Sequence, residues 1–451
     1  MSYATTSSGT CSGIRPQVQT KTTKKPSKRS PSASEIAKNK AYFETWSHHQ
    51  SLEQVSYKDI PKDLKDAVVK VFDVSKRIPL GWVDENSPQY QLLKKLATPG
   101  FLSFMRQAYE QNKKLFYDEK NDELAFGQLF MDISTVYSSW ESLVQMMDSK
   151  ESWSEADYSA NVYVPVRRAG LKQSTRRNQC RISLPQPLVL EKMGSESRRI
   201  LGARMVIPDC AIFIPESLVK NLSDSKDSAF KVLKRHKKVA KVGAPGKQTS
   251  FAYQSTPSMS LANAPCFEFA SSFSEDKKPS HQILEDAYRQ NRMSTAAAVR
   301  HLHSLHVNAP VFGLVWASNN VRAHVDWWKV SDDGQLVVYS APYSRGKAGK
   351  EKEWKLERPA HLIELFLLLR NIDHYTTDCF VKRVNLGIQG LLTTVVEEGK
   401  VFEPWRKTTD GPPRSSTQHK ENISSSSDSS AAPSPKQSSK RKSRQRKRIS
   451  Q

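Results

Sequence analysis

The chain has 451 residues, of which 25% are charged and 37% hydrophobic, and its formal net charge is +23 at pH 7. This length and composition predict one large folded domain or two ordinary ones, with polar tails at the ends. Five cysteines without any C-x-x-C pair exclude a disulfide framework or a zinc ribbon and indicate reduced thiols. Because no apolar run reaches the length of a membrane span and the N-terminus has no secretory signal, we expect an intracellular protein without a membrane partner.

The positive charge is concentrated in three parts of the chain. Residues 1–40 carry eight Lys or Arg against one Glu, and residues 406–451 carry twelve against three acids. Residues 151–250 carry nineteen against nine. Clustered positive charge is typical of proteins that contact a polyanion or carry nuclear import signals. The two densest runs, at 21–29 and 440–448, predict a nuclear location, with the cytoplasm as the alternative.

The first third of the chain predicts a tail followed by helices. Residues 1–34 are rich in Ser, Thr, Lys and Pro without periodicity, which is typical of a disordered basic tail. In residues 35–150 the apolar side chains recur at helical spacing, which predicts a helical region. Three segments carry this pattern most clearly: 64–74, 101–117 and 124–147.

Residues 151–405 predict an α/β domain with a mixed central sheet flanked by helices. The expected strands are the short apolar runs at 162–166, 205–214 and 266–273. A helix over 279–306, a β-hairpin over 311–328 that turns at Asn319-Asn320, a strand over 335–340 and a helix over 359–371 should follow. A basic insertion near 215–263, with its most basic part at 231–247, is expected to be mobile. Residues 406–451 predict a disordered, Ser-rich basic tail.

Two expected strands carry single carboxylates that could act in metal-dependent phosphodiester cleavage. Such cleavage needs carboxylates to hold Mg²⁺ and a cation near the attacking water. Asp209 follows Pro208 in the second strand, and Glu268 lies in the third. With the helix and hairpin after them, these residues resemble the PD-(D/E)XK, or restriction-endonuclease-like, superfamily. That resemblance implies a restriction-endonuclease-like fold, with Asp209 and Glu268 as catalytic residues and, in an active enzyme, as Mg²⁺ ligands.

The segment from this helix through the hairpin also resembles the part that precedes the kinase lobe in fungal-type protein kinases, and uncharacterised fungal proteins share the arrangement. The sequence has no Gly-rich loop, His-Arg-Asp or Asp-Phe-Gly motif, which excludes kinase activity. The Lys of the superfamily's Glu-x-Lys motif is replaced by Ala270. The leading interpretation is therefore a catalytically degenerate, non-enzymatic domain that uses no cofactor and contacts nucleic acid or protein in the nucleus.

Three alternatives stay open. The chain could be an active Mg²⁺-dependent nuclease whose lysine has migrated, with Lys277, Lys278 or Gln282 near the following helix as candidates. It could instead be a protein-interaction module whose basic ends serve only nuclear import. In the third, Asp209 and Glu268 are ordinary polar residues at strand ends.

Any nucleic-acid contact is expected to be independent of sequence, because no base-reading element is recognisable. The residues expected to contact phosphates lie in the insertion and in the C-terminal tail: Lys234, Arg235, Lys237, Lys238, Lys440, Arg441, Lys442, Arg444, Arg446, Lys447 and Arg448. His301, His303 and His306 are expected to be surface or helix-end residues rather than metal ligands. Asp326 is expected to end a strand, and residues 350–357 to form an exposed edge strand.

Overall fold

The computed structural model describes residues 29–117, 123–191, 193–240, 251–261, 264–278, 284–317, 319–344 and 351–406. All of these residues belong to one compact unit, the body, within Met1–Asp410. Among them, no helix is both long enough and apolar enough to cross a membrane.

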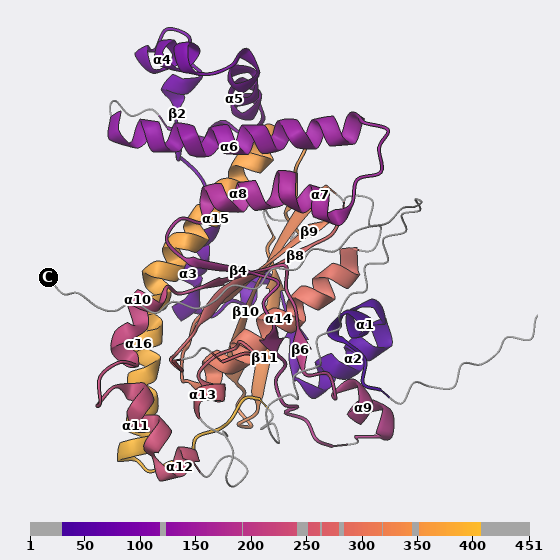
Figure 1. Cartoon of the computed structure of the whole chain (residues 1–451), viewed down its shortest axis with the longest axis vertical. Helices are drawn as coiled ribbons and strands as arrows, with labels where there is room; N and C mark the ends of the chain where they lie inside the picture. Colours follow the sequence, from indigo (N-terminus) through magenta and orange to yellow (C-terminus); the bar gives the residue numbers. More distant parts are fainter. Residues whose placement is uncertain are drawn as a thin grey trace, which may run out of the picture. The chain divides into compact units, whose positions relative to one another are not determined.

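A mixed sheet of eight strands runs through the centre of the body (Figure 1). Its strands are β1 (Leu52–Gln54), β4 (Thr175–Asn178), β7 (Cys210–Phe213), β8 (Ala270–Asp276), β9 (Val311–Ala317), β10 (Asn320–Val330), β11 (Leu336–Pro342) and β12 (Glu353–Lys355). The order across the sheet is β1-β11-β10-β9-β8-β7-β4, and β12 pairs with one end of β10. The pairs β1–β11 and β8–β9 are parallel, and the others are antiparallel.

Helices cover both faces of this sheet, as expected of the α/β domain. On one face, α14 (Leu284–Ser304) packs on β8, β9 and β10, and α1 (Ala33–Lys38) packs on α14. On the other face, α15 (Pro359–Thr377) contacts β8, and α8 (Val164–Gly170) packs on α15. Two adjacent residues of β9 face opposite sides of the sheet. A Cβ on Gly313 would collide with Asn291 of α14, whereas the ring of Phe312 contacts Tyr375 of α15.

The remaining helices surround this centre. They are α2 (Lys40–His49), α3 (Lys62–Phe72), α4 (Pro88–Leu96), α5 (Pro99–Gln111), α6 (Glu123–Asp148), α7 (Glu155–Tyr158), α9 (Ser195–Ile200), α10 (Glu216–Val219), α11 (Ala229–Arg235), α12 (Lys237–Ala240), α13 (Phe251–Gln254) and α16 (Cys379–Leu392). Two short sheets pair β2 (Ile78–Pro79) with β3 (Phe116–Tyr117) and β5 (Ile182–Ser183) with β6 (Met205–Val206).

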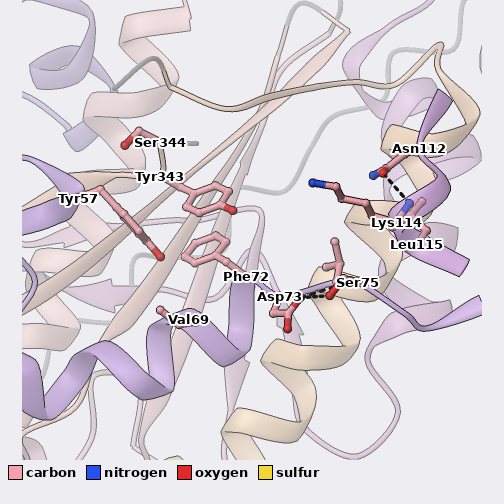
Figure 2. A pocket seen from close by; sticks show the side chains of 11 residues that line it. Tyr57, Val69, Phe72, Asp73, Ser75, Asn112, Lys114, Leu115, Tyr343 and Ser344 are labelled. Carbon is pink, nitrogen blue, oxygen red and sulfur yellow. Dashed lines mark hydrogen bonds between the residues drawn. The ribbon is translucent and has the colours of Figure 1, made fainter. Parts of the chain in front are cut away.

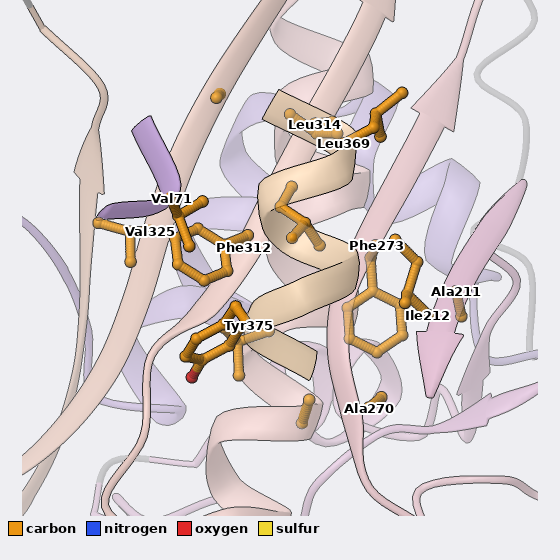
Figure 3. Packing of buried hydrophobic residues seen from close by; sticks show 14 of the residues in the cluster. Val71, Ala211, Ile212, Ala270, Phe273, Phe312, Leu314, Val325, Leu369 and Tyr375 are labelled. Atoms are coloured by element: carbon orange, nitrogen blue, oxygen red, sulfur yellow. The ribbon is translucent and has the colours of Figure 1, made fainter. Parts of the chain in front are cut away.

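The helix α15 is mostly apolar and mostly buried because it lies in the interior. It packs against α3, α5, α6, α8 and α16 as well as against β8. Figure 3 shows Leu369 and Tyr375 of α15 among buried side chains of the sheet, including Phe312 and Leu314. Burial of a side chain such as Leu or Phe contributes about 1.5–3 kcal/mol. The helix expected over 359–371 is confirmed and continues for a further turn and a half to Thr377.

Most of the predicted elements are confirmed. The helical segments at 64–74 and 124–147 correspond to α3 and α6. The segment at 101–117 corresponds to α5 only as far as Gln111, because Phe116–Tyr117 form the strand β3. The expected hairpin is formed by β9 and β10, and Asn319 at its turn has a φ of +58°, a conformation that Asn adopts more readily than most residues. The strand expected over 335–340 is β11. The edge strand expected within 350–357 is β12, although its Trp354 is buried rather than exposed.

Two of the strand predictions were wrong. Residues 162–166 lie in a π-type turn and in the start of α8, where Pro165 occupies a first-turn position that needs no amide hydrogen. A short apolar run cannot distinguish a buried helix from a buried strand. The run 205–214 is not one strand, because Pro208 lies between β6 and β7, which belong to different sheets.

The expected limits of the mobile segments also need correction. Residues 229–235 and 237–240 are the helices α11 and α12, so the first half of the predicted mobile stretch is helical, while 241–250 lie outside the described residues. At the N-terminus, α1 begins at Ala33 with a capping box between Ser32 and Glu35, before the expected end of the tail at residue 34. At the other end, the side chain of Arg406 is buried in the body.

Candidate functional site

The start of β7 places Asp209 beside the end of β8. Cys210 pairs with Ser274 in the antiparallel β7–β8 ladder, and one further step of this register brings Asp209 opposite Glu275. The Asp209 carboxylate accepts a hydrogen bond of 2.7 Å from the backbone N–H of Asp276. The Pro-Asp pair therefore fixes a half-buried carboxylate against the last residues of a central strand.

Glu275 and Lys277 lie on the same face of β8, because residues two apart in a strand point the same way. Glu275 pairs with Val315 of β9, which packs on Ala287 of α14, so this is the α14 face of the sheet. The Lys277 ammonium lies 2.7 Å from Glu275 Oε1 and 2.7 Å from the carbonyl oxygen of Asp276. Glu275 is 1% exposed, and its Oε2 has no hydrogen-bond partner among the described residues.

Burial and neighbouring charges raise the pKa values of both acids in this group. Burial, with a contribution from the negative charge of Asp276, raises the pKa of Asp209 to about 6. Burial also raises the pKa of Glu275 well above its ordinary value, and the Asp209 charge adds to that rise. Burial alone would lower the pKa of Lys277, but the Glu275 carboxylate, together with Glu155 of α7, raises it. Two carboxylates with raised pKa values beside one lysine form a site with surplus negative charge.

The intervening residue, Asp276, points to the opposite face and is bound by Arg167 of α8. Both guanidinium NH groups of Arg167 donate to the Asp276 carboxylate, one of them at 2.9 Å, and both side chains are 2% exposed. The guanidinium also lies 4.8 Å from the ring centroid of Trp316. The Tyr163 hydroxyl donates to the carbonyl oxygen of Lys277 at 3.0 Å. These contacts fix the backbone that carries Glu275 and Lys277.

The oxygen atoms at this edge are of the kind that a hard divalent cation accepts as ligands. Within the described residues, no three side chains of His, Cys, Asp or Glu gather as a metal-binding group. Asp276 is committed to Arg167, so the available oxygens are those of Asp209 and Glu275 and the Asp276 carbonyl, which already faces Lys277. Carboxylate and carbonyl oxygens are the ligands that Mg²⁺ accepts, and Mg²⁺ usually completes its shell with water and substrate phosphate. The unpaired Oε2 of Glu275 fits such a role.

The structure does not bring Glu268 to this group. Glu268 precedes β8, at the end away from Asp209, at a distance on the order of 20 Å along the strand by the usual rise per residue. Its carboxylate accepts hydrogen bonds from Arg177, at 2.5 Å, and from Thr256. Glu268 is thus bound in a structural ion pair, and it cannot share a metal with Asp209. Ala270, the expected lysine position, is buried in the core.

The basic residues expected to contact phosphates are also far from Asp209. Lys234 and Arg235 on α11 and Lys237 and Lys238 on α12 are exposed. The ring of Phe230 on α11 contacts Phe267, which precedes β8, so these helices lie near the beginning of that strand (Figure 1). The expected tail residues, from Lys440 to Arg448, lie outside the described residues. In the described part of the chain, exposed Arg168 and Lys278 follow closely on Arg167 and Lys277.

The histidine expectations were partly wrong. His301 is fully buried, with its ring against Phe269 and Trp405, and burial, helped by the positive charge of Arg406, lowers the pKa of His301 to about 3. His303 is largely buried beside Trp328, whereas His306 is a helix-end residue, as expected.

Asp326 is not a free strand-end residue. It is fully buried in β10, where its carboxylate faces His324 Nδ1 at 2.8 Å and accepts from Thr295. His324 Nε2 lies 2.7 Å from Asn291 Oδ1. These polar side chains are hydrogen-bonded between α14 and the sheet, which indicates a structural role.

Two cavities lie at different places on the body. One cavity, of about 640 Å³, is lined by Ile207 and Gln290, among others. Ile207 is close in sequence to Asp209. Arg29 and Arg204 are in its wall. The other, of about 350 Å³, lies between Tyr57, the stacked rings of Phe72 and Tyr343, and Lys114 (Figure 2). It contains none of the residues that the sequence singled out.

The sequence also contains a motif that points to the residues beside Asp209, although the prediction chose Glu268 instead. Glu275-Asp276-Lys277 is itself a Glu-x-Lys motif, and Lys277 was a candidate for the migrated lysine. The strand β8 reads Ala-Ser-Ser-Phe-Ser-Glu-Asp, and the prediction placed it too early, at 266–273, because its second half is too polar to look like part of a central strand, although all seven residues are buried. Only the strand register identifies Glu275, rather than Glu268, as the partner of Asp209.

No protein-family model matches the chain, and no curated protein matches it.

Proposed function

We propose that this protein is a divalent-cation-dependent phosphodiesterase acting on nucleic acid, with Asp209, Glu275 and Lys277 as its catalytic residues. One observation carries the proposal: Asp209 lies opposite Glu275 in the register of β7 and β8, and Lys277 is paired with Glu275 at the same edge. They resemble the Asp and Glu-x-Lys of the PD-(D/E)XK superfamily, with Glu275 in the place first expected for Glu268. The succession of β7, β8, α14 and the hairpin β9–β10 agrees with that resemblance.

Each residue has a role that its surroundings support. Asp209, Glu275 and the Asp276 carbonyl would hold Mg²⁺, which supplies neutralisation of the charge that develops on a phosphate under attack. Lys277, beside Glu275, would orient the attacking water and stabilise the negative charge on it. Arg167 keeps Asp276 turned away, so that its carbonyl rather than its carboxylate faces the site. Arg168 and Lys278 are exposed nearby and could contact neighbouring phosphates.

Nucleic acid is the proposed substrate because the chain is strongly basic outside this edge. The net charge of +23 favours a polyanion, and the exposed lysines of α11 and α12 would add contacts independent of sequence. The basic runs near the two ends, expected to direct the protein to the nucleus, fit the same partner. Binding should therefore weaken as salt rises.

The test is cleavage of labelled DNA and RNA by the full chain with Mg²⁺ or Mn²⁺. Asp209→Asn and Glu275→Gln should each reduce the cleavage rate by at least about a hundredfold, because each removes a charge that binds the cation. Glu268→Gln is the matched control, since it changes a partly buried carboxylate just before the other end of the same strand. It should leave cleavage close to that of the wild type.

Two results would count against the proposal. Cleavage that survives Asp209→Asn would show that another site does the chemistry. If the wild type binds nucleic acid in a salt-dependent manner but cleaves none with either metal, the domain is the degenerate binding module that the replacement at Ala270 first indicated.

A further inference from the structure

The ammonium of Lys277 occupies the place that the proposed function gives to a metal ion. It lies 2.7 Å from Glu275 Oε1 and 2.7 Å from the Asp276 carbonyl, two of the three groups assigned to the cation. We infer that Lys277 is an internal cation that holds the site together in the metal-free protein. A divalent ion then binds only when this ammonium moves away. The inference rests on the proposed function and adds a competition within the same site.

The contacts of Lys277 allow such a movement. Its backbone N–H donates to the Trp316 carbonyl at 2.7 Å, and its own carbonyl accepts from the Tyr163 hydroxyl at 3.0 Å. The strand end therefore stays in place. The side chain is 17% exposed and reaches its two oxygen partners through a flexible four-carbon stem. Rotation about that stem can move the ammonium without disturbing β8.

Arg167 cannot move in the same way. Its planar guanidinium holds both oxygens of Asp276 and lies over Trp316 at 2% exposure. Arg167 is thus a fixed structural partner, whereas Lys277 can be displaced.

The charge count favours displacement by a divalent ion. With Asp276 paired to Arg167, one ammonium remains for the two carboxylates of Asp209 and Glu275. Glu275 Oε2 has no partner among the described residues, and the Asp209 carboxylate accepts only a backbone hydrogen bond among the contacts found for it there. A divalent ion can neutralise both carboxylates at once, whereas the ammonium is bound to one.

The experiment measures Mn²⁺ binding by isothermal titration calorimetry on the full-length wild type, Lys277→Met and Lys278→Met. Lys277→Met removes the competitor, so it should bind Mn²⁺ at least about tenfold more tightly than the wild type. Lys278→Met removes the same charge from an exposed neighbour, and it should stay within about threefold of the wild type because solvent screens it. Mn²⁺ should also raise the melting temperature of Lys277→Met more than that of the wild type.

Several outcomes would overturn the inference. Equal or weaker Mn²⁺ binding by Lys277→Met would mean that the lysine supports cation binding rather than opposing it. An equal gain in Lys277→Met and Lys278→Met would assign the effect to overall charge. In both cases, if the wild type binds Mn²⁺ and Asp209→Asn does not, the proposed function still stands. Absence of binding in every variant overturns both. Lys277→Gln, which keeps a polar group beside Glu275, provides the same comparison if Lys277→Met folds poorly.

Discussion

At the scale of single residues, the candidate site depends on which side chain is bound by which partner. Asp276 and Glu275 are adjacent acids on one strand, yet they have opposite roles. Asp276 is neutralised by Arg167 within the core, while Glu275 faces Asp209 and Lys277. The alternation of side chains along β8 produces this division, because neighbours in a strand point to opposite faces. Asp276 therefore anchors the strand, whereas Glu275 lies at the proposed cation site.

The anchoring role of Arg167 predicts a large loss of stability in Arg167→Met. The substitution leaves the Asp276 carboxylate buried without its partner, and breaking a buried pair in this way costs about 3–5 kcal/mol. The measurement is urea unfolding followed by circular dichroism. Arg168→Met, at the exposed neighbour, should change stability by less than about 0.5 kcal/mol. The double variant Arg167→Met with Asp276→Leu should recover most of the loss, and a failure to do so would contradict this explanation.

At the scale of elements, the sequence predicted the helices and strands that follow from the spacing of apolar residues. It misplaced the strand whose buried residues are polar. The helices α3, α5, α6 and α15 and the hairpin β9–β10 follow from hydrophobic spacing and a turn at Asn319. The strand β8 was predicted too early, at 266–273, because its buried residues are mostly Ser, Glu and Asp. Its partners come from distant segments, such as Arg167 and Thr376, which hydrogen-bonds Ser271. Contacts of that kind are invisible in a local pattern, so Glu268 was chosen in place of Glu275.

The helix α14 provides a pH-dependent test of the core at His301. The unfolded chain binds a proton at this residue below about pH 6.5, whereas the lowered pKa of about 3 keeps the buried ring neutral in the folded chain. The stability that the neutral His301 ring contributes is therefore fully present above pH 6.5 and is lost as the pH falls towards 3. Between pH 7 and pH 5 this loss should amount to about 2 kcal/mol.

His301→Leu should remove this part of the pH dependence, so that its unfolding free energy falls less than that of the wild type between pH 7 and pH 5. Urea unfolding at the two pH values measures the difference. Leu302→Ala is the control, because it should cost about 2–5 kcal/mol by opening a cavity at either pH without changing the slope. An unchanged slope in His301→Leu would mean that the ring is protonated in the folded chain.

At the scale of the whole molecule, the body is closed by a short segment before the C-terminal tail. The main chain of Trp405 donates to Gln254, and its indole N–H donates to the Gln254 carbonyl at 3.0 Å. Arg406 donates to Ser183 and to the Ser258 carbonyl, and Phe402 packs against Phe251. The expected tail of 406–451 therefore begins with a residue that belongs to the fold. We therefore expect the residues beyond that point to add contacts with nucleic acid without contributing to the stability of the body.

Removal of residues 411–451 should leave the melting temperature of the body within about 2 °C, since a change below 0.5 kcal/mol shifts it little. The same truncation should flatten the dependence of DNA affinity on salt, because each lost phosphate contact lowers the slope by about 0.9. Fluorescence anisotropy across a salt series measures that slope. A second truncation, after Lys400, also removes Phe402, Trp405 and Arg406, which are buried in the body. It should lower the melting temperature by about ten degrees or more, because each large aromatic side chain lost from a core costs about 3–5 kcal/mol. If the first truncation unfolds the body, or leaves the salt slope unchanged, the basic tail is not the separate phosphate-binding segment that its charge predicts.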